Sequence, residues 1–129
     1  MSKTFSDLLA EMISRRPSEL LKDGTRVFYF KDHAVKLVNG EMEGIHWMDI
    51  QIVLKRFQLN GLMAAQKVLK ANLEMGGATP IPTWFGANEQ GALVFINRLD
   101  WQHMTAEVLD DHINRCIEQM SQALVSEGV

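Results

Sequence analysis

Four histidines are the side chains of this chain best suited to acid–base or metal chemistry, and their spacing keeps them apart. No two stand at the i, i+4 spacing that puts two ligands on one helix face, and no H-E-x-x-H motif occurs. His33 falls in a predicted turn and His112 on the polar side of a predicted helix, so both are expected on the solvated surface. His46 lies in a predicted strand and His103 just before a helix, where local hydrogen bonding is the expected role.

The other reactive groups form no constellation either. Asp110 and Asp111 are adjacent on the face of the predicted last helix that is expected to be solvated. Neighbouring helical side chains point about 100° apart, so the two carboxylates do not converge. Cys116, the only cysteine, falls on the apolar face of a predicted helix, which indicates a buried, inert thiol. The glycine doublet Gly76–Gly77 matches neither a P-loop nor a dinucleotide fingerprint. We therefore expect no enzyme, no cofactor and no metal.

Length, charge and hydropathy limit the number of domains and the classes of partner that the chain is expected to have. With 129 residues, 47% of them hydrophobic, the chain is expected to form one domain over 1–129. The net charge is −3 and the basic doublets Arg15–Arg16 and Lys55–Arg56 are isolated, so no basic stripe favours nucleic acid. No stretch approaches the ~20 apolar residues that span a bilayer, and no signal peptide is evident at the start. We expect a cytoplasmic protein with neither nucleic acid nor membrane as partner.

The elements that would position a site follow from periodicity and turn residues. A first helix carries apolar residues at helical spacing, is capped at Thr4 or Ser2, and ends before Pro17. Strands are predicted over 25–31, 34–38 and 45–54 because these runs are rich in aromatic and β-branched residues. Asn39–Gly40 is the strongest hairpin signal in the chain.

The predicted second helix, over 60–75, has two apolar stripes. One stripe holds Leu62, Ala65, Leu69 and Leu73, and the other holds Ala64, Val68, Ala71 and Met75. So wide an apolar surface indicates burial on more than one side. In a domain this small, we expect one stripe to face its own sheet and the first stripe to form a homodimer interface.

The last part of the chain completes an α+β pattern. Pro80 and Pro82 flank the start of a strand over 81–85, which predicts a sheet edge because proline donates no ladder hydrogen bond. A strand over 92–96 and a helix capped at Thr105 follow. The order α-β-β-β-α-β-β-α predicts an antiparallel sheet with three helices laid on it.

The strands carry apolar residues on both faces. Phe28 and Phe30 alternate with Val27 and Tyr29, and a single helical layer covers only one face of a sheet. Part of this surface should be exposed and bind protein. The opposing interpretation is that helices and a second subunit cover both faces.

The chain resembles the class I chaperones of type III secretion, the Tir-chaperone (CesT-like) group. The resemblance spans nearly the whole element order and is closest from Val68 to Leu124. It includes the run 68–73, the following glycine doublet, the strand pair 81–85 and 92–96, the segment 98–100 and the closing helix 107–124. The most specific element is Leu69-x-x-Asn72-Leu73. Before Met42 only the order of elements matches.

The resemblance implies a bacterial cytoplasmic homodimer that binds the unfolded N-terminal segment of a secreted effector protein and keeps it soluble and secretion-competent. It implies partial strand addition to a sheet edge and contacts in hydrophobic grooves. For effector binding the candidates are six apolar side chains from helix and strands: Leu8, Met12, Phe28, Phe30, Trp84 and Phe95. The mild charge departs from the family, and the doublet Lys55–Arg56 has no assigned role.

Two other functions remain open from the residues. One is a regulatory or interaction module of the same fold, binding a folded partner or another secretion component. The other is a small-molecule binder or enzyme with a cleft near Trp84, Trp101 and His103.

Overall fold

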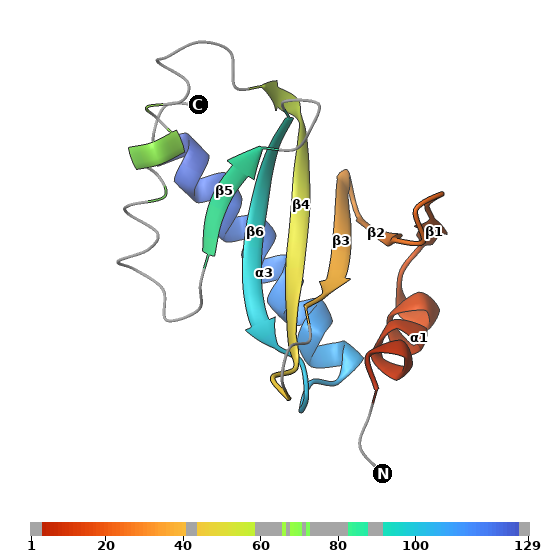
Figure 1. Ribbon diagram of the computed structural model, residues 1–129. Coiled ribbons are helices and arrows are strands. Elements are labelled where there is room, and N and C mark those ends of the chain that lie inside the picture. The colour runs from red at the N-terminus through yellow and green to blue at the C-terminus, as the bar shows by residue number, and fades with distance from the viewer. Residues whose placement is uncertain are drawn as a thin grey trace.

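The fold is described by a computed structural model (Figure 1), which covers residues 4–40, 44–58, 66, 68–70, 72, 83–87 and 92–126, with only the backbone at 55–58 and 123–126. Within these residues the chain forms a six-stranded antiparallel sheet and three helical segments, the predicted α+β fold. The described residues 66, 68–70 and 72 are helical and belong to the predicted middle helix. The other elements are α1 (Phe5–Arg15), β1 (Ser18–Leu20), β2 (Arg26–Phe30), β3 (His33–Asn39), β4 (Trp47–Gln58), β5 (Thr83–Ala87), β6 (Ala92–Asp100) and α3 (Ala106–Ser126).

The strands stand in the order β1-β2-β3-β4-β6-β5, and every neighbouring pair is antiparallel. The edge position predicted for β5 from its flanking prolines is confirmed. At the opposite edge, β1 was not predicted, because three residues are too few to show a strand period. Its pairing with β2 is closed by a turn at Gly24, whose φ of 88° suits glycine.

α1 begins and ends where its residues predict. The Thr4 hydroxyl accepts from the Asp7 amide and the Asp7 carboxylate accepts from the Thr4 amide, which is a complete capping box. Arg16 is extended, with φ −133° and ψ 145°, because Pro17 follows it. The helix therefore turns directly into the edge strand β1.

The hairpin predicted at Asn39–Gly40 forms between β3 and β4. The Gly40 amide donates to the Trp47 carbonyl at 2.9 Å, so pairing extends past the end of β3. A Cβ at Gly40 would lie 2.9 Å from the Trp47 ring, which explains why glycine is needed here.

One face of the sheet forms the hydrophobic core together with α1 and α3. The buried strand residues alternate along each strand, as side chains on one face must. α1 contributes Leu8 and Met12, and the middle helix contributes Val68. The remaining core side chains include Phe28, Phe30, Val35, Leu37, Met48, Ile50, Ile52, Phe85, Leu93, Phe95, Leu109, Ile113 and Met120.

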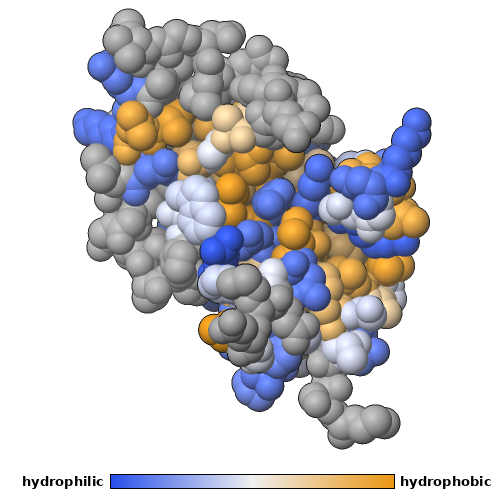
Figure 2. All heavy atoms as spheres, viewed as in Figure 1, coloured by the Kyte–Doolittle hydropathy of each residue, from blue (hydrophilic) through white to orange (hydrophobic). Residues whose placement is uncertain are grey.

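The other face of the sheet is turned away from α3, which runs behind the strands in Figure 1. The strand register aligns Tyr29, Ala34, Val53 and Val94 as a row across β2, β3, β4 and β6 on this face. Figure 2 shows this side of the molecule, where apolar surface over β4 and β6 is interrupted by polar groups. We call it the open face.

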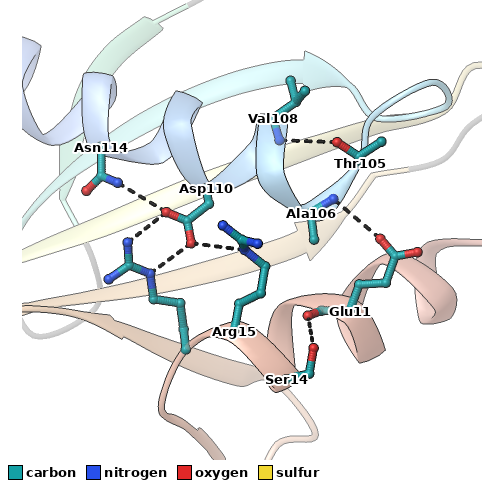
Figure 3. Close-up of polar contacts among 9 residues, drawn as sticks. Glu11, Ser14, Arg15, Thr105, Ala106, Val108, Asp110 and Asn114 are labelled. Atoms are coloured by element: carbon teal, nitrogen blue, oxygen red, sulfur yellow. Dashed lines mark hydrogen bonds and ion pairs between the residues drawn. The ribbon is translucent and has the colours of Figure 1, made fainter.

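α1 is fastened to α3 by a polar cluster at their contact (Figure 3). The Arg16 guanidinium donates to both carboxylate oxygens of Asp110, at 2.9 and 2.7 Å, and Asn114 donates to the same carboxylate at 3.1 Å. The Arg15 guanidinium lies 3.6 Å from it. On α1, Glu11 accepts from the Ala106 amide in the first turn of α3.

This cluster corrects the prediction that Asp110 lies on the solvated face of the last helix. Its residue is only 5% exposed, because α1 covers it and supplies the compensating charges. The hydrogen bonds from Arg16 hold the pKa of Asp110 below its ordinary value of 3.8.

Replacing Asp110 by Asn is expected to lower the free energy of unfolding by about 2 kcal/mol at pH 7, because a charge-assisted bidentate bond is lost. Urea unfolding measures this loss, with Asp111→Asn, an exposed neighbour, as the control. A folded carboxylate with a depressed pKa contributes stability above pH 3.8 that is lost as the pH falls through its lowered pKa. The two proteins should therefore converge in acid; equal stability at pH 7 would contradict the prediction.

Candidate protein-binding surface

Five of the six side chains predicted to contact an effector lie in the core. Leu8, Met12, Phe28 and Phe95 are 0% exposed and Phe30 is 2% exposed. The expected exposure of Phe28 and Phe30 is wrong, because their strand parity is the one that faces α1 and α3. The surface that is open to a partner is made by other side chains.

Trp84, the sixth predicted contact, lies on the open face beside an arginine. The Arg98 guanidinium stands 4.4 Å from the Trp47 ring centroid and 5.4 Å from that of Trp84. It donates to both oxygens of Asp49, at 2.7 and 3.0 Å. The charge is neutralised and the two rings are held in place, so this cluster is a rigid, half-buried part of the open face.

Of the four residues predicted to form the dimer interface, the structure describes Leu69, which is helical. Its side chain is 62% exposed, whereas its neighbour Val68 is 6% exposed and belongs to the core. Leu62, Ala65 and Leu73 lie outside the described residues. Of the described residues of the two stripes, Val68 therefore faces inward and Leu69 faces solvent.

A hollow of about 280 Å³ lies between α1 and the β1–β3 side of the sheet. Phe5 and Leu9 of α1 line one wall, and Leu20, Leu37 and Val38 make up the rest of its apolar lining. Gly24, Thr25, Arg26 and Asn39 complete the lining. Leu20 and Val38 are 60% and 36% exposed. We call this hollow the α1 groove; its apolar walls are accessible to a side chain from outside.

The edge strand β1 borders the α1 groove. The Leu21 amide donates to the Thr25 carbonyl and the Tyr29 amide donates to the Pro17 carbonyl, so residues 17 and 21 face β2. Because the direction of backbone groups alternates along a strand, Ser18 and Leu20 direct theirs away from the sheet. Within the described ranges, no other backbone group pairs with them. A main-chain edge and an apolar groove thus adjoin at Leu20.

The residues considered first for chemistry are dispersed. His103 is exposed, His33 is half-buried at the start of β3, and the His46 ring lies 5.2 Å from the Trp101 ring. Cys116 is buried, as predicted, and desolvation raises the pKa of its thiol to about 12. In the described part of the chain, no group of three or more histidine, cysteine or acidic side chains is placed to hold a metal ion. None of the described helices is both long enough and apolar enough to cross a bilayer.

His112 was predicted to lie on the solvated surface, and this prediction is wrong. It is half-buried and joins α3 to the sheet, because its Nε2 lies 2.8 Å from the Asn97 Oδ1. The Asn97 amide donates to the Thr83 hydroxyl at 2.8 Å, which leaves Oδ1 to accept a hydrogen bond from the imidazole N–H. Desolvation, aided by the nearby Arg115 charge, lowers the pKa of His112. The helical pattern placed it on the polar side and could not show that Asn97 reaches it.

A scan of protein-family models found no match to this chain, and a search of curated proteins also found none.

The lowered pKa of His112 predicts a pH-dependent stability. The folded state favours the neutral imidazole, so stability is complete above pH 6.5 and falls as the pH drops from there through the lowered pKa. Relative to His112→Gln, which keeps a donor and does not titrate, the wild-type protein should lose up to about 1.4 kcal/mol per pH unit in that window. Urea unfolding between pH 5 and 7.5 measures this; a constant difference would contradict it.

Proposed function

We propose that this protein is a homodimeric class I type III secretion chaperone, which binds the unfolded N-terminal segment of an effector and keeps it soluble and secretion-competent. The observation that carries the proposal is the open β1 edge beside the α1 groove. The resemblance of the sequence to this family supplies the identity of the partner, a secreted protein. We propose that the protein acts by binding alone and catalyses no reaction.

An extended segment suits the β1 edge because it can use the open main chain of β1 and the α1 groove at the same time. Its main chain pairs with the outward groups of Ser18 and Leu20, as in other cases of strand addition. Its side chains alternate, so those on one face recur about every 7 Å and one of them fits the α1 groove. A folded partner would have to release a strand to make the same contacts.

One groove does not hold such a segment by itself. Burying one large apolar side chain contributes about 1.5–3 kcal/mol, whereas ordering each residue of an unfolded chain costs about 1–2 kcal/mol in backbone entropy. A bound segment therefore needs several contacts along its length. The open face supplies further contact area through the half-buried side chains Tyr29, Ala34 and Val53, and a dimer doubles it.

The dimer is supported by the middle helix. Leu69 exposes more than half of its surface while Val68 is packed into the core. The stripe that shares the spacing of Leu69 is apolar along the predicted helix, so a second copy of the same helix is a fitting cover for it. We propose this stripe as the centre of the homodimer interface.

Leu69→Asp is expected to produce a folded monomer, because the exposed side chain serves the interface and the charge opposes its burial there. Light scattering after size exclusion measures the mass and circular dichroism reports the fold. Val108→Asp, at an exposed apolar position of α3, is the matched control and should remain a dimer. An unchanged dimer in Leu69→Asp would count against this interface.

Leu20→Asp is expected to weaken capture of the effector segment by about tenfold or more, because it puts a charge at the mouth of the α1 groove. Leu20 is 60% exposed, so stability should change little. Val108→Asp, an exposed valine on α3 outside the groove, is the control. Calorimetry with the captured segment gives the affinities. Equal binding by both variants would place the segment elsewhere.

The function itself is tested by co-purification from the native host followed by mass spectrometry. The expected partner is a secreted protein, retained through an N-terminal segment that is unfolded when free and extended when bound. Capture of a protein that is folded when free would instead favour the interaction module of the same fold.

A further inference from the structure

The edge opposite β1 is occupied by a side chain of the protein itself. The Asn72 carboxamide, on the middle helix beside β5 (Figure 1), contacts the main chain of Phe85 at the centre of that strand. The Phe85 amide donates to Asn72 Oδ1 at 2.5 Å, and the Asn72 Nδ2 donates to the Phe85 carbonyl at 3.1 Å. One side chain therefore satisfies both backbone groups of one residue.

These two backbone groups are the ones that an added strand would use. β5 pairs with β6 through the register Trp84↔Ile96, Phe85↔Phe95 and Gly86↔Val94. Since Phe85 bonds Asn72 with both groups, Phe85 and Phe95 form the non-hydrogen-bonded type of pair, in which side chains lie close. The two rings agree with this, because their centroids are 5.4 Å apart.

A carboxamide has the donor and acceptor of a peptide group, so Asn72 bonds Phe85 as one residue of a neighbouring strand would. Unlike a strand, the Asn72 side chain offers no further main-chain edge to which another strand could pair. Unpaired edges are the places where sheets add other chains, and proteins commonly block them.

We propose that Asn72 is a strand substitute that closes the β5 edge to main-chain pairing and leaves the β1 edge as the place for an extended segment. The edge closure stands on the Asn72–Phe85 geometry alone, and the assignment of the β1 edge rests on the proposed function. Without Asn72, the β5 edge pairs with the β5 edge of another copy. This gives Asn72 of the Leu69-x-x-Asn72-Leu73 run a physical role.

The first test uses the wild-type protein and compares two outward-facing edge amides. The Phe85 amide is bonded by Asn72 and the Leu20 amide faces away from β2, so Phe85 should exchange its hydrogen at least about tenfold more slowly after correction for intrinsic rates. Residue-resolved exchange by NMR measures both. Equal protection of Phe85 and Leu20 would overturn the proposal without any variant.

The second test uses Asn72→Ala, with Gln66→Ala on the same helix as the control. Asn72→Ala should raise the exchange rate of Phe85 about tenfold and leave the buried β4 amide of Ile50 unchanged. It should also associate further with rising concentration in sedimentation velocity. Asn72→Asp keeps the acceptor for the Phe85 amide but loses the donor, so its Phe85 exchange should be intermediate.

Faster Phe85 exchange without added association would overturn the edge-closing role, and association by Gln66→Ala would do the same. Neither the hydrogen exchange of Phe85 nor the sedimentation velocity uses an effector. A failure to bind an effector segment at β1 would therefore contradict the proposed function without changing the outcome of these two measurements. If Asn72→Ala fails to fold, the wild-type comparison and Asn72→Asp still decide the proposal.

Discussion

A β-sheet that is not closed into a barrel has two edges, and the main-chain groups at each must bond to something. In this protein the main-chain groups at the two edges have different partners. At β5 the Asn72 carboxamide bonds both groups of the central residue, Phe85. At β1 the backbone of Ser18 and Leu20 faces outward beside an apolar groove. The difference between the edges determines where an extended polypeptide has room to pair, and the proposed function depends on it.

The open edge is held in place by the contact between α1 and α3. β1 follows α1 after Arg16 and Pro17, and Arg16 donates to Asp110 through Nε and Nη2. The same arginine stacks over Phe30, 4.2 Å from the ring centroid, so the junction of helix and strand is anchored to the core. Phe5 and Leu9 of α1 then form one wall of the groove. A partner would therefore meet a preformed edge and groove, which reduces the entropy lost on binding.

The element pattern of the sequence predicts much of this architecture, and long-range contacts account for what it misses. Thr4, Pro17 and Thr105 act locally, so the helix ends they set are correct, and the prolines at 80 and 82 correctly indicate an edge strand. Strand parity gives two alternating faces but not which one α3 covers, and the aromatic residues at 28, 30 and 95 were assigned to the wrong one. Asp110 and His112 look solvated on a helical wheel because Arg16 and Asn97 come from distant segments. β1 has too few residues to show a period.

Amide hydrogen exchange of the protein with and without its captured segment decides whether an extended segment pairs with β1. We expect the Leu20 amide to become protected by about tenfold or more on binding, while the Phe85 amide, already bonded to Asn72, changes little. A segment that binds tightly and leaves the exchange of Leu20 unchanged would contradict strand addition at this edge.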